Sequence, residues 1–251
     1  MEFVGGPVSP APRVLLEAWD TFGYTSPIQS ARRYSDMSPG NAAFYPTSLG
    51  SGTVIRTTNG VNTRRSQITG AAFNGASSSD TLYGVPLAQI VASTLPATGG
   101  RALRRYTFAV NVLMSATDPN AFVEVGLKTT AARMETVAGS WGVVAAIRGA
   151  STWQACHKLT TGGAFVAGAA SGLSPTAPRR ITVIYEESTS SPQILVKVGD
   201  QTLLTLAGQA NMPVMANGVA SAFGLCVGGY SVGAVTRDVD FWDTLFRVEE
   251  I

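Results

Sequence analysis

Apolar and polar residues alternate along much of the chain with the period of two that is typical of strands. The run LRRYTFAVNVLM shows this most clearly, because Tyr106, Phe108, Val110 and Val112 fall on one face. Such alternation predicts a half-buried strand whose apolar face is turned toward a core. Comparable apolar runs predict further strands at 13–19, 52–57, 65–74, 121–128, 141–148, 151–158, 180–186, 193–198, 201–206, 219–227 and 238–248. About eleven to thirteen strands and very little helix are therefore expected.

Turn residues separate these runs. Asp118-Pro119-Asn120 is a strong turn signal, and Gly149-Ala150 separates two runs that we expect to form a hairpin. Gly199-Asp200 has glycine at the first central position, which suits a type II′ hairpin turn. Two longer stretches, at 20–50 and roughly 75–100, read as irregular connections. The second contains one possible helical turn at 86–93, where Pro86 would be the first helical residue.

Composition supports one large β domain. Hydrophobic residues make up 45% of the 251 residues and charged residues only 14%, so the chain has ample material for a core. Its 27 Gly and 13 Pro are scattered, as expected of many short strands joined by turns. Residues 1–12, rich in Gly and Pro, are expected to form an extended N-terminal arm that contacts its own domain or a neighbouring subunit. Residues 13–251 are expected to form a single antiparallel β-sandwich.

Charge is small in total but uneven. Residues 1–105 hold nine Arg and five acidic residues, a balance of +4, whereas residues 237–251 hold two Arg and five acidic residues, a balance of −3. These opposite ends could meet across a subunit contact, or they could be two differently charged solvated faces. The basic residues are 15 Arg and only three Lys, at Lys128, Lys158 and Lys197.

Two cysteines are too far apart in sequence for a zinc motif. Cys156 and Cys226 lie in apolar runs, which predicts two buried thiols, although strands distant in sequence can bring such residues together as a disulfide. The N-terminal residues show no conventional signal peptide, and no apolar stretch approaches the ~18 residues that span a membrane. We therefore expect a protein made in the cytoplasm and not inserted in a membrane.

The order of elements at 180–206 resembles a known family. A strand RITVIYE, a polar turn, a strand ILVKV, a Gly-Asp turn and a strand TLLTL follow one another, and DFWDTLFRVEEI closes the chain. This order is similar to the second half of concanavalin A-like (laminin-G-like) jelly rolls, in which the last strand pairs with one near the N-terminus. The opening VLLEAWDTFGY also resembles the first strand of such domains in tailed-bacteriophage virion proteins. The resemblance implies a jelly roll that binds glycans, decorates capsids, forms fibre tips or hydrolyses β-glucans.

Catalytic residues are scarce. His157 is the only histidine, and it directly follows Cys156, so on a strand their side chains would point to opposite faces. The cluster Asp238, Asp240 and Asp243 has a spacing similar to the catalytic carboxylates of β-glucanases with this fold, or it could bind Ca²⁺ through oxygen ligands. A charged, exposed face of an end strand is the simpler interpretation. We therefore predict no catalytic residue, no metal site and no cofactor.

Aromatic residues in the long connections are the remaining functional signal. They could stack on sugars or form a protein interface, or they could pack over the ends of the sandwich. The candidates are Tyr24, Tyr34, Phe44, Tyr45 and Tyr83. Arginine pairs are dispersed along the chain without regularly spaced aromatics, so no nucleic-acid partner is expected.

The sequence predicts a structural protein of a phage virion, either capsid-decorating or tail-associated, and not an enzyme. It would act as a homo-oligomer in contact with other virion proteins. A carbohydrate-binding module or adhesin for a cell-surface glycan, using the loop aromatics, is the alternative. A glycoside hydrolase using the cluster of Asp238, Asp240 and Asp243 is a more remote one.

Overall fold

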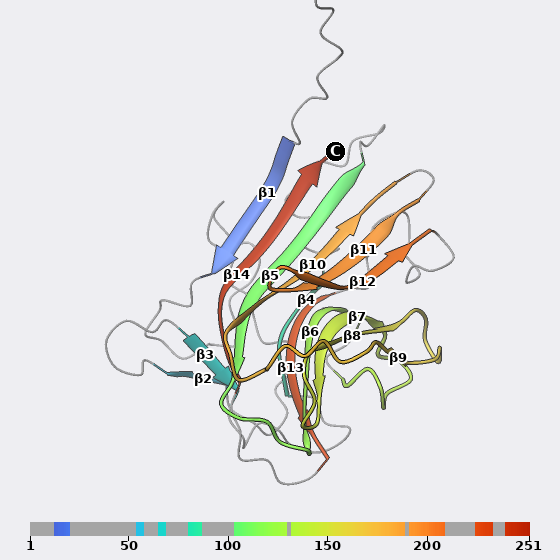
Figure 1. The fold of residues 1–251 in the computed structure, drawn as a ribbon. Helices are drawn as coiled ribbons and strands as arrows, with labels where there is room; N and C mark the ends of the chain where they lie inside the picture. Colours follow the sequence, from blue (N-terminus) through green and yellow to red (C-terminus); the bar gives the residue numbers. More distant parts are fainter. Residues whose placement is uncertain are drawn as a thin grey trace, which may run out of the picture.

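The computed structural model describes residues 13–20, 54–57, 65–68, 80–86, 103–129, 132–188, 191–208, 224–232 and 239–251. These residues form fourteen strands in two antiparallel sheets, with no helix among them (Figure 1). The predicted all-β sandwich is confirmed. The predicted N-terminal arm, residues 1–12, lies outside the described residues.

The larger sheet has eight strands and carries the C-terminal strand near its middle. Its path is β12 (Gln201–Ala207), β11 (Gln193–Val198), β10 (Arg179–Glu186), β5 (Arg104–Met114), β14 (Val239–Glu250), β3 (Arg65–Ile68) and β2 (Val54–Thr57). Strand β1 (Arg13–Asp20) pairs with the second half of β14, as the jelly-roll resemblance implies. Figure 1 shows β1 beside β14 with the two strands running in opposite directions.

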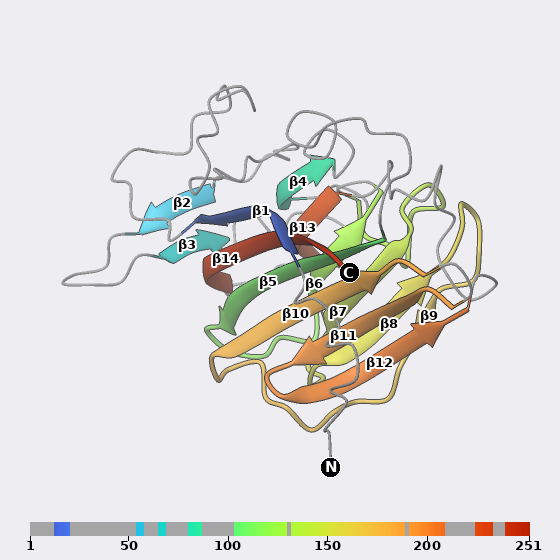
Figure 2. The same ribbon diagram turned by 90° about the horizontal axis from the view of Figure 1, so that it is seen from above.

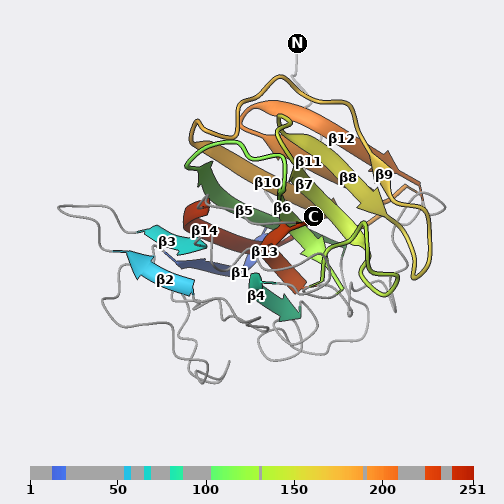
Figure 3. The same ribbon diagram turned by 90° about the horizontal axis from the view of Figure 1, so that it is seen from below.

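The smaller sheet has six strands. Its order is β4 (Asp80–Pro86), β13 (Gly224–Ser231), β6 (Ala121–Lys128), β7 (Gly142–Arg148), β8 (Gln154–Lys158) and β9 (Val166–Ala167). Figures 2 and 3 show this sheet stacked on the larger one, with β8 and β9 on the same side of the sandwich as β12.

The core lies between the sheets and follows the alternation in the sequence. Tyr106, Phe108, Val110 and Val112 of β5 are each no more than 3% exposed, as predicted. They meet apolar residues of β6, β7 and β8 from the other sheet within one continuous core cluster. Burying an aliphatic or aromatic side chain of this kind stabilises a fold by ~1.5–3 kcal/mol. The core therefore explains why one face of each strand is apolar.

Two predicted turns are confirmed. The hairpin of β7 and β8 turns at Gly149, whose φ is +62°. The hairpin of β11 and β12 turns at Gly199, whose φ is +59°, while Asp200 has a negative φ. A positive φ at the first central residue alone is the geometry that a type II′ turn requires.

Two strands were not predicted. The stretch at 75–100, interpreted as irregular, contains β4, which pairs with β13 along the edge of the six-stranded sheet. Gly84 and Pro86 are residues that usually interrupt strands, but an edge strand tolerates both because one side of it makes no ladder. Pro86 ends this strand instead of beginning a helix, and the rest of the proposed helical turn lies outside the described residues. With β4 and the two-residue β9, the strands exceed the predicted number.

Candidate functional site

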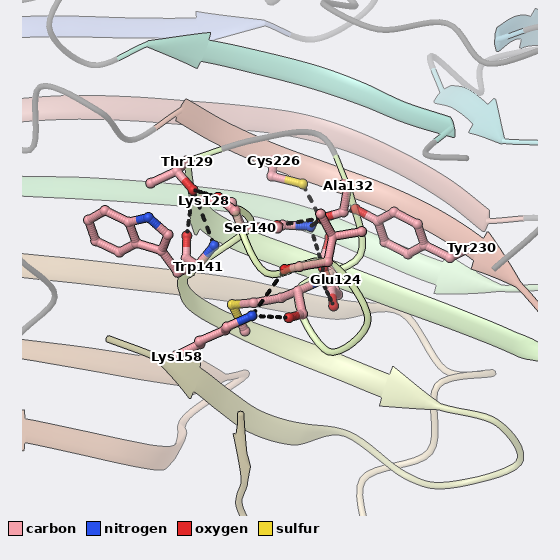
Figure 4. Close-up of polar contacts among 12 residues, drawn as sticks. Glu124, Lys128, Thr129, Ala132, Ser140, Trp141, Lys158, Cys226 and Tyr230 are labelled. Atoms are coloured by element: carbon pink, nitrogen blue, oxygen red, sulfur yellow. Dashed lines mark hydrogen bonds and ion pairs between the residues drawn. The ribbon is translucent and has the colours of Figure 1, made fainter. Parts of the chain in front are cut away.

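Charged side chains gather on the outer face of the six-stranded sheet. Glu124 and Lys128 of β6, Lys158 of β8 and Tyr230 of β13 all lie on this face, and each is at most 4% exposed. We call these four residues the buried polar cluster. They lie beneath the connection between β6 and β7, which is described over residues 132–141 (Figure 4).

Lys128 is the centre of the cluster. Its ammonium group forms an ion pair with Glu124 and donates hydrogen bonds to the carbonyl oxygen of Ala132 and the hydroxyl of Tyr230, both at 2.7 Å. Three acceptors match the three donors of an ammonium group. The charge is thus fully compensated, as a buried charge must be to be tolerated.

The other members of the cluster hold the backbone of the connection. The carboxylate of Glu124 accepts a hydrogen bond from the backbone N–H of Met134 at 3.1 Å. Lys158 donates to the carbonyl oxygens of Met134, at 3.3 Å, and Val137, at 3.0 Å. Charged side chains of the sheet therefore supply hydrogen-bond partners to the backbone of the connection.

Met134 fixes the same connection from its apolar side. Its fully buried side chain packs with Val144, Ala146 and Cys156 in a second, smaller apolar cluster on the outer face of the sheet, and Phe165 packs against that cluster. The face is consequently filled by the protein's own chain, with a polar half around Lys128 and an apolar half around Met134.

A glycine makes room for the tyrosine hydroxyl. A Cβ atom on Gly228 would lie 2.4 Å from the Oη atom of Tyr230, a distance that real Cβ atoms do not reach. Gly228 and Tyr230 are two residues apart on β13 and so share a face. The glycine therefore allows Tyr230 to lean along its strand toward Lys128, whose ammonium nitrogen is 4.8 Å from the centre of the Tyr230 ring.

A second set of ion pairs lies nearer the surface. The carboxylate of Glu135 bridges the guanidinium groups of Arg133 and Arg148. Arg133 lies 3.5 Å from the ring centre of Phe122, and Arg148 lies 5.3 Å from that of Phe165. Burial raises the pKa of Glu135, but the hydrogen bonds and charges of the two arginines outweigh it, so the pKa is lowered overall.

The sequence pattern missed the role of this cluster. The alternation in AFVEVGLK puts Glu124 and Val125 on opposite faces, as observed, but does not show that the face of Glu124 is covered by chain and not by water. One signal was present, since two of only three lysines in the chain belong to the cluster. Lysine offers a compact charge with three donors, which suits this position better than the planar fork of arginine.

The eight-stranded sheet presents a different polar group on its outer face. Strand β14 changes partner along its length, from β3 at Val239–Phe241 to β1 at 244–250, and a bulge lies at the change. Asp243 occupies the bulge with a φ of +49° and is the only non-glycine residue with positive φ in the described part of the chain. Asn111 donates to its carboxylate at 3.1 Å, and Arg180 donates to its carbonyl oxygen.

The three aspartates of the predicted cluster differ in their surroundings. Asp243 is exposed, Asp240 is half-buried and has interacting partners, and Asp238 lies outside the described residues. The described contacts of Asp243 hold the bulge, an ordinary role at a place where a strand changes direction. Among the described residues, no three His, Cys, Asp or Glu side chains are placed to hold a metal ion.

His157 and the two cysteines follow the predictions. Cys156 is opposite Val144 of the outer cluster, and His157 is opposite Val143 of the core, so the two side chains do point to opposite faces. Burial lowers the pKa of His157. Cys156 and Cys226 are buried free thiols, and burial raises their pKa values to about 12 and about 11.

The predicted aromatic candidates fall mostly outside the described residues. This applies to Tyr24, Tyr34, Phe44 and Tyr45, while Tyr83 lies in strand β4 and not in a connection. Every aromatic side chain whose exposure the structure describes is buried or half-buried.

Comparisons with known proteins find similar folds only. No protein-family model matches the chain, and no curated protein matches its sequence significantly. A solved protein of unknown function from Shewanella oneidensis MR-1 has a TM-score of 0.48 at 12% identity, covering 95% of this chain and 88% of that one. A structure from a study of endo-acting O-glycanases of human gut microbiota has a TM-score of 0.47 at 12% identity, covering 93% and 98%. Peanut lectin has a TM-score of 0.46 at 15% identity, covering 82% and 95%.

Similarity at this level identifies no ligand or activity for this chain. The described residues also contain no helical stretch with the length and hydropathy that a membrane crossing requires.

Proposed function

We propose that this protein is a structural subunit that acts through contacts with copies of itself and with other proteins of a phage particle, and not an enzyme. The observation that carries the proposal is the low share of charged residues, 14% of the sequence, and their scarcity among the exposed side chains. Of the side chains described as exposed, only Asp200 and Asp243 are charged, and the others are mainly Ala, Gly, Ser and Thr. Surfaces of soluble monomers usually carry abundant mixed charge, and its loss promotes association.

Charged residues are scarcest on one side of the sandwich. Residues 159–178 include no charged residue, and Val166, Ala167, Ala169 and Ala170 of this segment are exposed. Strand β12 of the other sheet, at the same side of the sandwich, has no charged residue either (Figure 3). A partner surface can cover such a side at a low cost of desolvation, because no charge has to be removed from water.

The charged groups that do gather support a structural role for another reason. The buried polar cluster uses its hydrogen-bonding capacity to hold residues 132–141 across the six-stranded sheet. Its ammonium and carboxylate groups are thereby committed to the fold, whereas a catalytic acid or base must reach a substrate.

The proposal is tested by measuring the molecular mass of the protein in solution and its binding to phage particles. Sedimentation equilibrium over a wide range of protein concentration should show a defined oligomer, and the purified protein should co-sediment with phage particles that lack it. A monodisperse monomer that does not bind particles would overturn the proposal. A glycan array on the same sample tests the alternative of a carbohydrate-binding protein, because an adhesin would bind a defined glycan whatever its oligomeric state.

A further inference from the structure

We infer that two copies of this chain associate through β12, which pairs antiparallel with β12 of the second copy across a two-fold axis at Thr205. This inference rests on the proposed function and specifies the contact. Strand β12 ends the path of the eight-stranded sheet and, among the described strands, pairs with β11 alone. Its other side is thus an edge of the sheet, and four of its seven residues are exposed. The two eight-stranded sheets would join along this edge.

Strand β12 lacks the features that usually keep sheet edges apart. Edges are normally protected by charged residues, by proline or by very short length. Among the other described edge strands, β1 has three charged residues, β2 has Arg56, β4 has Asp80 and Pro86, and β9 has only two residues. The sequence of β12, QTLLTLA, has none of these features. A bulge at Leu203 leaves Leu204–Ala207 in a regular ladder with β11.

The ladder between β11 and β12 fixes which backbone groups face the edge. Gly208 donates its backbone N–H to the carbonyl oxygen of Pro192 at 3.0 Å. Because hydrogen-bonded and non-hydrogen-bonded pairs alternate in an antiparallel ladder, Leu204 and Leu206 turn their backbone groups toward β11, and Thr205 turns its N–H and C=O away from it. Thr205 and its counterpart in a second copy can therefore exchange two backbone hydrogen bonds across the axis.

The same axis places matching side chains opposite each other. Thr205 meets Thr205 of the second copy on the outer face, and facing threonines can hydrogen-bond. On either side of the axis, Leu204 meets Leu206 of the second copy on the core face. Both leucines pack against the core cluster but are only half-buried within one chain. The pairing therefore sets polar positions against polar ones and apolar positions against apolar ones.

Symmetry explains why an uncharged edge favours a second copy as partner. When a strand pairs with a copy of itself, the residue on the axis faces itself, so a charge there would meet a like charge. A contact with a different protein carries no such restriction, because it can place opposite charges against each other. The absence of charge along all of β12 satisfies the condition for self-pairing.

The core also reaches the surface on this side of the sandwich. Leu203 of β12 and Leu173 of segment 159–178 pack against the core cluster and are only half-buried. Val166 of the same uncharged segment is 44% exposed. Figure 3 shows β9, which contains Val166, on the same side of the sandwich as β12. A second copy paired along β12 would lie beside this segment, so the contact would extend beyond one strand pair.

The first test places a charge on the axis. Thr205→Lys sets two ammonium groups opposite each other, which opposes pairing. Thr205 is exposed in the single chain, so the fold should be unaffected, as circular dichroism checks. The matched control is Thr117→Lys, which adds the same charge at an exposed threonine between β5 and β6. Sedimentation equilibrium should show a dissociation constant raised about tenfold or more by Thr205→Lys and unchanged by Thr117→Lys.

A symmetric disulfide provides an independent test. Residues that exchange hydrogen bonds in an antiparallel ladder have Cα atoms about 5.5 Å apart, within the range of a disulfide. Under mild oxidation, Thr205→Cys should form a covalent dimer at a protein concentration where Thr117→Cys stays monomeric on a non-reducing gel. The native Cys156 and Cys226 are buried and are the same background in every sample.

The outcomes separate this inference from the proposed function. If the parent sediments as an oligomer and Thr205→Lys leaves its dissociation constant unchanged, the pairing of β12 is wrong and the structural role stands. An oligomer in which Thr205→Cys links no better than Thr117→Cys overturns the pairing in the same way. A parent that stays monomeric at every concentration overturns the pairing, and it also overturns the proposed function if it does not bind phage particles.

Discussion

On the outer face of the six-stranded sheet, Lys128 and Glu124 lie buried beneath residues 132–141, with every donor of the ammonium group satisfied. On the outer face of the eight-stranded sheet, Asn111, Arg180 and Asp243 make a comparable set of polar contacts at the surface, around a bulge. The two sets use similar chemistry at different depths, so their energetic consequences should differ. A buried charge that loses its partner is costly, whereas a surface contact competes with water and contributes little.

The largest effect should come from Lys128→Met. This change leaves the Glu124 carboxylate buried without its counter-charge, which typically costs about 3–5 kcal/mol. Urea denaturation followed by fluorescence measures the loss. The double variant Lys128→Met, Glu124→Gln is the control, because it removes both charges and should recover a large part of the stability. A loss of less than about 1 kcal/mol in the single variant would show that the cluster is not desolvated.

A smaller loss should follow Tyr230→Phe. The ring stays and the hydroxyl disappears, so Lys128 loses one of its three hydrogen-bond partners. Leaving one buried donor unsatisfied typically costs ~1–3 kcal/mol. Hydrogen exchange should show faster opening of the backbone amide of Met134, because the connection is held by the same cluster. An unchanged exchange rate with an unchanged unfolding midpoint would contradict the role assigned to Tyr230.

At the bulge, the backbone conformation of Asp243 should matter more for stability than its side-chain contact. Asp243→Val should destabilise by about 1–3 kcal/mol, because a β-branched residue is strained at a positive φ. Asp243→Gly relaxes that strain and loses only the surface contact with Asn111, so its unfolding midpoint should lie close to that of the parent. Equal losses in both variants would show that the carboxylate, and not the backbone conformation, matters at this position.

The smallest effect should come from Glu135→Gln, because Glu135 and Arg148 are partly solvated and glutamine can still accept a hydrogen bond from the buried Arg133. A loss of about 1 kcal/mol or less is expected at neutral pH. The pKa of Glu135 is lowered in the folded state, so its contribution is present above the ordinary value of 4.5 and is lost as pH falls through the lowered pKa. The two proteins should therefore converge in stability in acid, as thermal unfolding at a series of pH values can measure. A difference that grows in acid would contradict this sign.

Each local prediction that succeeded rests on a signal within a few residues. The alternation at Tyr106, Phe108, Val110 and Val112 identified the core face of β5, and Gly199-Asp200 identified a turn of the expected type. β4 was missed because Gly84 and Pro86 are breakers in most contexts, and only its position at an edge makes them acceptable.

The candidate site could not be predicted in the same way. Alternation places Glu124 and Lys128 on the outer face of β6 but does not tell whether water or chain covers that face. The partners that satisfy Lys128 come from the same strand, from the following connection at Ala132 and from Tyr230, more than a hundred residues later. Their meeting depends on the pairing of β13 with β6.

The amino-acid sequence by itself determined the all-β class, most of the strands, the core face of those that alternate, and the separation of Cys156 from His157 to opposite faces. These properties follow from periodicity and turn chemistry, which act over a few residues. Only the tertiary structure decided that Lys128 is buried and that β14 changes partner at Asp243. Both depend on which strands become neighbours, and that choice is made by packing and hydrogen bonding between segments far apart in the chain.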